Sequence, residues 1–450
     1  MRSHGRRASW VLSFAVTIAG GMLVGPLVPA GATIGEAKQR RRSPALHDHA
    51  DQEQHGEVVD GAEGTESASW TRSVEARRNG AMVRTAPDAQ RSEPRGLLAP
   101  GARFAVLDRR AGGGCSGDWL RVADDAWVCA DHVTLVRAEP AVGPYPVLDD
   151  DAIVPFEYAF SGRAGTRAFA RPSDIDAGTS AATLGTSWGL AIVGTDMWRG
   201  QPVARTTRGT WIVARELRWV EPSRFAGVTL ARGQPATTLS VAWVRRGGAP
   251  TFADPDGRRR TGRLRGRALV PVGTEATAGG EPMTRLSEGG FVPSSLLVRP
   301  TRIAPPEGVA RGERWIDVDL ERQTLVAYEG AEPVFATLVS TGRRPGTTPV
   351  GLHRVWIKIA HATMDNVEDD DARQTYSMDG VPWIQYFAGD VALHAAYWHD
   401  GFGAVRSHGC VNLAPRDARW LYAFTSPRVP DGWARMFPPP GERGTPVHVR

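Results

Sequence analysis

Residues 397–413 read YWHDGFGAVRSHGCVNL and contain Cys410, the only cysteine in the last two thirds of the chain. Gly409 directly precedes this cysteine, so the backbone can turn sharply there and direct consecutive N–H groups at a developing oxyanion. His394 lies sixteen positions before Cys410, at the end of an expected strand, and is a candidate base for a thiol nucleophile. Because an imidazole beside a thiol lowers the pKa of the thiol, the pattern predicts a thiolate–imidazolium pair at neutral pH.

Two other interpretations of Cys410 remain open from the residues alone. The cysteine could bind zinc together with His394, His399 and His408, although their spacing matches none of the usual ligand patterns. It could also be a small buried apolar residue, although the neighbouring histidine and glycine are typical of a polar, open turn. Thiol acyl transfer requires no metal or organic cofactor, and we expect none.

The wider sequence around Cys410 resembles the signature of L,D-transpeptidase catalytic domains, in which a histidine is followed by Ser/Thr-His-Gly-Cys-x-Asn. The resemblance covers residues 313–450 and includes STG…TPVG (340–351), VPWIQYF (381–387), PRDARWLY (415–422) and GTPVHV (444–449). It implies a β-sandwich-like domain with short helices, and an enzyme whose partners are peptidoglycan stem peptides.

The resemblance also implies roles for individual residues. Cys410 would be the nucleophile and His394 the general base and acid. The amides near His408, Gly409 and Cys410 would bind the oxyanion, and Ser407 and His408 would shape the turn, unless they are purely structural. Tyr397 and Trp398 would contact the donor stem, although packing alone also explains them. Asn412 would hold the loop by hydrogen bonds.

The residue after the base departs from several relatives, which carry Ser or Gly where this chain has Ala395. A third catalytic member must then be a backbone carbonyl that accepts the imidazole N–H. Such an acceptor is sufficient to orient the ring and fix its tautomer.

The reaction implied by the resemblance is acyl transfer from a tetrapeptide stem to Cys410, with release of D-alanine and formation of 3,3 cross-links. Water or a protein amine as acceptor would instead give an L,D-carboxypeptidase or a wall-protein ligase. A catalytically inactive cell-wall-binding protein is the alternative from a different class.

The chain of 450 residues is long enough for several domains, and 41% hydrophobic with 23% charged residues is typical of globular protein. The 51 glycines and 33 prolines favour turns and short strands. We therefore expect a mainly β protein: three small SH3-like β barrels followed by the L,D-transpeptidase-type domain. Nothing in the sequence sets the oligomeric state.

Residues 1–32 are expected to be a secretory signal, with three early arginines, an apolar run and the trio Ala30, Gly31 and Ala32. An uncleaved membrane anchor is the alternative. Loss of the signal would lower the formal net charge from +5 to +2, which removes the basis for nucleic-acid binding. The sequence thus predicts an exported protein of the periplasm or cell wall, with a polar, disordered spacer at residues 33–74.

Three similar segments follow, at residues 75–138, 155–222 and 238–302. They end in WVCADHVTLV, WIVARELRWV and FVPSSLLVRP, and their short Val/Leu runs resemble bacterial SH3-like barrels. Such repeats could contact the cell wall or simply space the catalytic domain. In the first repeat, Cys115 and Cys129 are expected to form a disulfide that closes a loop of about 15 residues and stabilises by roughly 3 kcal/mol.

Within residues 313–450, alternating apolar residues predict strands at 315–320, 324–330, 334–340 and 354–360, the first three as an antiparallel meander. Helical spacing occurs only at residues 414–424, where Pro415 suits a first turn. The acidic stretch 364–374 lacks the pattern of a calcium loop and is expected to be a solvated loop.

Overall fold

We describe a computed structural model of residues 73–450, without residues 78–79, 150, 163–164, 234–238, 279 and 368–374. The described residues belong to one compact unit, Ala68–Arg450. The expected signal at residues 1–32 and nearly all of the expected spacer lie outside them. The first strand begins at Ser73, so the last two residues of the expected spacer belong to that strand.

The described residues of the first repeat range form short strands and one 3-10 turn, Ala130–His132. They enclose a core that includes Val74, Val83, Leu98, Leu120 and Val128. The strands are β1 (Ser73–Ala76), β2 (Ala81–Arg84), β3 (Pro94–Leu98), β4 (Arg103–Ala105), β5 (Asp108–Arg110), β6 (Trp119–Ala123), β7 (Ala126–Cys129) and β8 (Val133–Val136).

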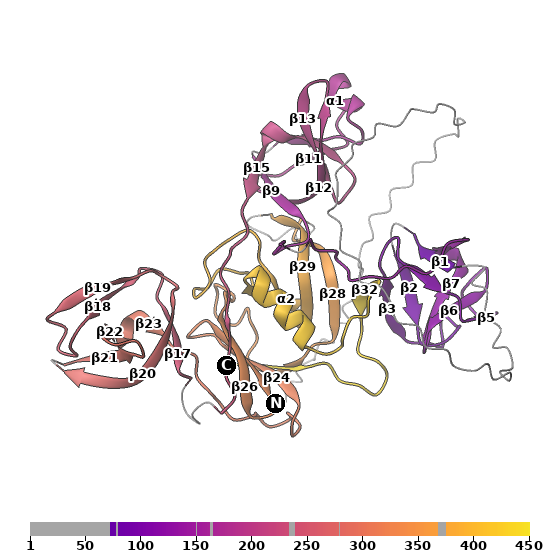
Figure 1. Ribbon diagram of the computed structural model, residues 1–450. Helices are drawn as coiled ribbons and strands as arrows, with labels where there is room; N and C mark the ends of the chain where they lie inside the picture. Colours follow the sequence, from indigo (N-terminus) through magenta and orange to yellow (C-terminus); the bar gives the residue numbers. More distant parts are fainter. Residues whose placement is uncertain are drawn as a thin grey trace, which may run out of the picture. The chain divides into compact units, whose positions relative to one another are not determined.

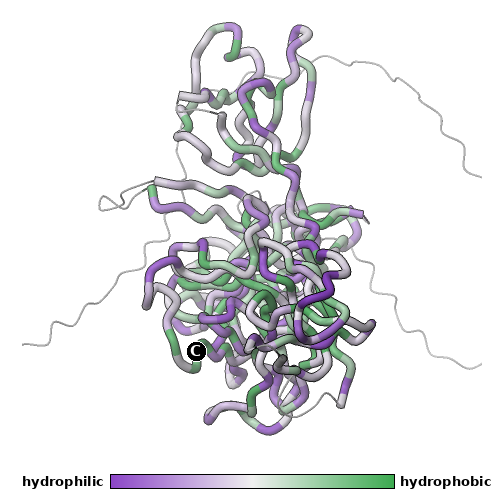
Figure 2. Tube along the Cα trace, turned by 90° about the vertical axis from the view of Figure 1, so that its left-hand side faces the viewer, coloured by the Kyte–Doolittle hydropathy of each residue, from purple (hydrophilic) through white to green (hydrophobic). Residues whose placement is uncertain are grey.

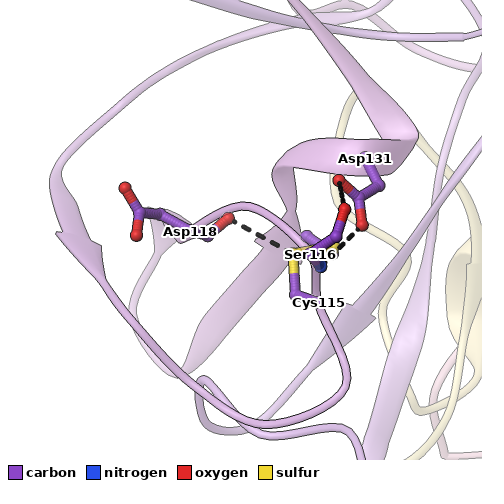
Figure 3. The surroundings of a disulfide bond; sticks show 5 residues. Cys115, Ser116, Asp118 and Asp131 are labelled. Atoms are coloured by element: carbon purple, nitrogen blue, oxygen red, sulfur yellow. Dashed lines mark hydrogen bonds between the residues drawn. A yellow bond between two sulfur atoms is a disulfide. The ribbon is translucent and has the colours of Figure 1, made fainter.

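Cys115 and Cys129 are joined by a disulfide in this first segment. Cys129 ends β7, whereas Cys115 lies in the loop between β5 and β6 (Figure 3). The loop is also tied by Ser116, whose backbone N–H and hydroxyl both donate to the Asp131 carboxylate at 2.8 Å. The bridge therefore fixes a loop against the end of a strand.

The second repeat range adds a short helix that the sequence analysis did not predict. Helix α1 (Ser173–Ala177) buries none of its side chains and ends at Gly178 in the left-handed conformation, so it has no apolar face to detect. The strands are β9 (Glu157–Ser161), β10 (Thr166–Ala168), β11 (Ala182–Leu184), β12 (Gly189–Trp198), β13 (Gln201–Thr206), β14 (Trp211–Val213) and β15 (Leu217–Val220).

The third repeat range is likewise built of strands, around a core that includes Val244, Val272 and Val292. The short strand β16 (Val228–Thr229) precedes it. Its own strands are β17 (Val241–Val244), β18 (Ala249–Phe252), β19 (Arg260–Leu264), β20 (Leu269–Ala278), β21 (Glu281–Leu286), β22 (Phe291–Pro293) and β23 (Leu297–Val298).

The C-terminal segment begins with the predicted meander of β24, β25 and β26, paired antiparallel. The predicted strand at 354–360 is interrupted at Val355 and Trp356, between β27 and β28. The elements are β24 (Arg314–Asp319), β25 (Thr324–Glu329), β26 (Glu332–Leu338), β27 (Gly351–Arg354), β28 (Ile357–Asp365), β29 (Ser377–Ala388), β30 (Val391–Ala395), β31 (Val411–Leu413), α2 (Pro415–Phe424), β32 (Trp433–Met436) and β33 (Pro446–Val449).

One hydrophobic core joins two sheets of this segment. Ile316 and Val449 belong to the sheet of β24 and β33, whereas Trp383 and Leu393 belong to the sheet of β28 to β31, and all lie in one buried cluster. Helix α2 adds Leu421 to that cluster and packs on β29 and β30 (Figure 1). Hydrophobic and hydrophilic residues alternate at short intervals along the trace (Figure 2). The expected mainly β fold is confirmed.

The repeats also pair with the C-terminal segment through their backbones. Strand β3 pairs with β32, β12 pairs with β29 at Gly189 and Met378, and β16 pairs with β26. From the sequence the repeats were expected to be separate units, because backbone pairing between distant strands leaves no local pattern. The SH3-like character of the three segments stays a prediction. In the described part of the chain, no helix is long and apolar enough to cross a membrane.

Candidate active site

A parallel strand pair brings Cys410 and His394 to the same face of a sheet. Strand β31 pairs with β30 in the register Leu393↔Val411 and His394↔Asn412. Because side chains alternate along a strand, Cys410 and Asn412 share the face on which His394 lies. All three line a cavity of about 230 Å³, together with Arg343, Met364, Tyr376, Met378, Trp398, Arg406, Ser407, His408 and Gly409.

The turn before Cys410 is held by side-chain hydrogen bonds. The Ser407 hydroxyl donates to the Cys410 carbonyl and accepts the Gly409 N–H at 3.1 Å. The Thr348 hydroxyl donates to the Gly409 carbonyl at 2.6 Å. The Gly409 amide is thus engaged within the turn, which leaves the amides of His408 and Cys410 as the candidates for binding an oxyanion.

His394 is nearly inaccessible to solvent, at 2% exposure, and its tautomer follows from one contact. Nδ1 lies 2.9 Å from the carbonyl oxygen of Ala395. A carbonyl can only accept, so Nδ1 carries the proton and Nε2 keeps its lone pair. The backbone acceptor that the sequence requires is supplied by the residue next to the base itself.

The electrostatic setting differs from the expected ion pair. Burial raises the pKa of the Cys410 thiol to about 11, and a hydrogen bond with the backbone of Ala392 opposes this only in part. Burial likewise lowers the pKa of His394 to about 4. Both shifts run against the expected thiolate–imidazolium pair, because loss of hydration penalises the charged form of both groups.

The two aromatic residues after β30 have different surroundings. Trp398 lines the cavity, with its ring centroid 5.7 Å from that of His394. Tyr397 is 1% exposed and does not line this cavity. Its ring stacks on Tyr158 of the second repeat, and its hydroxyl donates to the Asp379 carbonyl at 3.1 Å. Trp398 can contact a substrate as expected, whereas the expectation that Tyr397 forms a wall is wrong.

The segment that holds this cavity matches a known protein family. Residues 313–449 match the model of the YkuD family, which is described as the L,D-transpeptidase catalytic domain. These residues are an L,D-transpeptidase catalytic domain. The identification that rested on the stretch around Cys410 is confirmed.

Solved structures of L,D-transpeptidases are also similar to the chain. The catalytic domain from Enterococcus faecium is 27% identical over 31% of this chain and 98% of its own, with a TM-score of 0.24. The enzyme from Stackebrandtia nassauensis is 27% identical over 32% of this chain and 57% of its own, with a TM-score of 0.22. The enzyme from Mycobacterium smegmatis is 18% identical over 52% of this chain and 89% of its own, with a TM-score of 0.24. No curated protein matches the chain.

Two arginines at the cavity of the transpeptidase domain were missed by the sequence analysis. Arg343 is exposed and its backbone N–H donates to the Ser407 carbonyl at 3.0 Å. The Arg406 side chain packs on Gly401, where an added Cβ would lie 2.0 Å from its Nε. Both lie in loops, and the chain is rich in arginine, so the sequence alone did not distinguish these two from the others.

His408 lies at the edge of the transpeptidase cavity. Its ring is parallel to that of Tyr376, with centroids 5.1 Å apart. Burial and the charges of Arg343 and Arg344 lower the pKa of His408. The neutral ring and Tyr376 together form an aromatic edge to the site.

The zinc set considered from the sequence is not gathered in the transpeptidase domain. Among the described residues, one group of three potential ligands has its ligand atoms within 4.8 Å of one another: Cys115, Cys129 and Asp131. The two sulfurs of that group form the disulfide and are not available to a metal. His394, His399, His408 and Cys410 do not form such a group.

The loop after β30 is anchored from outside the transpeptidase domain. The Asp400 carboxylate accepts hydrogen bonds from the Ser223 hydroxyl and from both terminal nitrogens of Arg267. Arg267 also donates to the Asp400 carbonyl at 2.6 Å. Two residues on, Phe402 stacks on Phe225. The loop that carries Trp398 and His399 is therefore held by residues between β15 and β20.

Proposed function

We propose that this protein is an exported L,D-transpeptidase that cross-links peptidoglycan through a Cys410 acyl-enzyme. The observation that carries the proposal is that the Cys410 thiol and His394 line one cavity, with His394 held in the tautomer that leaves Nε2 able to accept a proton. The match of residues 313–449 to the transpeptidase family supports the substrate class.

The reaction begins from a neutral thiol. As the sulfur attacks the carbonyl of the third stem residue, a diamino acid, the thiol proton passes to Nε2 of His394. The resulting imidazolium then protonates the nitrogen of the terminal D-alanine, which leaves, and an acyl-enzyme remains. The amine of a second stem attacks this thioester, loses its proton to Nε2, and displaces Cys410 as a thiol. The new amide is a 3,3 cross-link.

Two positive charges support a donor with a free terminal carboxylate. Arg343 and Arg406 line the cavity that holds Cys410. Guanidinium groups bind carboxylates through charge-assisted hydrogen bonds. In this proposal they bind the carboxylate of the D-alanine that leaves.

Export and wall contact are the remaining parts of the proposal. Residues 1–32 would direct the chain to the periplasm or cell wall, either as a cleaved signal or as an anchor. A cavity of about 900 Å³ at the second repeat, lined by Phe156, Tyr158 and Trp219 among others, supports contact of the repeats with wall polymer. Loss of sacculus binding in Trp219→Ala would support this contact, and unchanged binding would refute it at this cavity.

The decisive experiment is mass spectrometry of the protein after incubation with a tetrapeptide donor. We expect a covalent adduct on Cys410 and free D-alanine, and neither in Cys410→Ala. Undiminished release of D-alanine by that variant would overturn the assignment. Ertapenem is a second probe, because a similar solved transpeptidase is acylated by it. Products with and without an added amine acceptor distinguish a transpeptidase from a carboxypeptidase, and a protein without any adduct would be the wall-binding alternative.

A further inference from the structure

Both ring nitrogens of His399 are engaged in the loop after β30. The Gly401 N–H donates to Nδ1 at 3.2 Å, and Nε2 lies 3.1 Å from the Asn412 carboxamide. A backbone N–H can only donate, so Nδ1 carries no proton and the proton of the neutral ring is on Nε2. Burial and the charge of Arg406 lower the pKa of His399 to about 4, so the ring is neutral at neutral pH.

The Asn412 carboxamide is the neighbour of Nε2 of His399. It is 3% exposed and belongs to the wall of the cavity. Its Nδ2 is the atom next to His399, which sets a donor against a donor, whereas Oδ1 has no hydrogen-bond partner among the described residues. Half a turn of the carboxamide exchanges two groups of nearly the same shape. Oδ1 then accepts the Nε2–H of His399, and the NH2 group takes the position that lacks a partner.

We propose that His399 is a positioning residue that fixes this orientation of Asn412, so that the buried carboxamide next to the cavity of Cys410 and His394 places an NH2 donor, instead of an oxygen, in the position that lacks a partner. The inference rests on the proposed acyl transfer at Cys410. Negative charge develops in this cavity when the sulfur loses its proton and when the attacked carbonyl becomes an oxyanion. A donor held in place beforehand stabilises that charge, whereas a carboxamide oxygen would repel it.

A role limited to holding the loop does not account for this contact. The loop has other anchors, because Asp400 is bound by Ser223 and Arg267, and Phe402 stacks on Phe225. The His399 contact instead reaches β31, two residues beyond the nucleophile.

Two substitutions of His399 distinguish the roles of its two ring nitrogens. In His399→Gln the side-chain amide nitrogen takes the place of Nε2 and keeps a donor toward Asn412. In His399→Asn the amide oxygen takes the place of Nδ1 and keeps the acceptor for Gly401. We expect the rate of Cys410 acylation by ertapenem to fall only a few-fold in the Gln variant and about a hundredfold in the Asn variant. If the Asn variant acylates as fast as the Gln variant or faster, the inference is overturned.

A second measurement needs no variant and no activity. Nitrogen chemical shifts of the free protein should show His399 protonated on Nε2 and His394 protonated on Nδ1. Protonation of His399 on Nδ1 would overturn the inference even if the variants fail to fold. Asn412→Asp, which keeps the acceptor for His399 but removes the NH2, should also lose about a hundredfold in acylation. Failure of the proposed function is distinguishable, because the wild-type protein would then give no Cys410 adduct with any donor.

Discussion

The ring of Tyr158 stacks on that of Tyr397, with centroids 3.7 Å apart and an angle of 16° between the planes. Tyr158 belongs to the second repeat, and Tyr397 directly precedes Trp398 in the wall of the active-site cavity. Both rings are almost fully buried, at about 1% exposure. A contact of this kind makes the position of the cavity wall depend on the repeat.

We therefore expect Tyr158→Ala to weaken both folding and catalysis. Truncation of a buried aromatic side chain costs about 3–5 kcal/mol, and the lost support should slow acylation of Cys410. Tyr158→Phe is the control, because it keeps the stack and loses only the hydrogen bond from the hydroxyl to the Gly380 carbonyl, worth roughly 1 kcal/mol. Thermal unfolding and the rate of adduct formation measure the two effects. Acylation of the Ala variant at the rate of the Phe variant would show that the repeat does not support the site.

The state of the Cys410–His394 pair gives a pH prediction. The pKa of the imidazole is about 4 and that of the thiol about 11, so both groups are neutral between these values. The acylation rate should be nearly constant across this range. It should fall as the pH approaches 4, because protonated His394 cannot accept the thiol proton, and thiolate absorbance should appear only as the pH approaches 11. A thiolate signal at neutral pH would contradict the neutral pair.

His394→Ala tests the same pair by removing the base. General base catalysis contributes about 100- to 10,000-fold to a rate, so acylation by a tetrapeptide should fall by that factor. Addition of imidazole, which is small enough to occupy a truncated site, should restore part of the rate. A His394→Ala protein that acylates at the wild-type rate would exclude this histidine as the base.

The turn at Gly409 predicts a steric effect. A Cβ added there would lie 2.8 Å from the Thr347 carbonyl oxygen, a backbone atom that cannot move aside alone. Gly409→Ala should therefore displace the turn that presents Cys410 and reduce acylation more than tenfold. Gly247→Ala is the matched control, because a Cβ at Gly247 meets nothing within 4 Å. Equal acylation by the two variants would show that the turn tolerates the displacement.

Local patterns in the sequence predict much of this fold. Alternating apolar residues correctly predict the meander of β24, β25 and β26, and Pro415 marks the first turn of α2. Helix α1 is a single exposed turn without an apolar face, so no such pattern reveals it. The parallel pairing of β30 with β31, which brings His394 to Cys410, depends on contacts between distant segments, so the sequence identified His394 only as a candidate base.

At the site, the sequence predicts which groups are present but not their surroundings. Neutral Cys410 and His394 follow from burial, which depends on the whole packed domain. Tyr397 was expected at the substrate because it adjoins Trp398, yet neighbouring side chains point in different directions and Tyr397 faces Tyr158. From the sequence His399 was considered only as a possible zinc ligand, because its two partners, Gly401 and Asn412, are identified only by geometry.

The charge at the cavity predicts a preference for donors with a free carboxylate. Arg343 lines the cavity, whereas the next residue, Arg344, does not, although both are exposed. Hydrogen bonds to charged groups contribute about 1.5–3 kcal/mol, so Arg343→Gln should lower kcat/KM for a tetrapeptide by roughly tenfold to a hundredfold. Arg344→Gln, the matched control, removes the same charge beside the cavity and should change kcat/KM by less than a few-fold. With a tetrapeptide amide as donor, which lacks the terminal negative charge, the difference between the two variants should disappear. A loss in Arg343→Gln that is equal for the acid and the amide would instead assign Arg343 to the loop that holds Ser407.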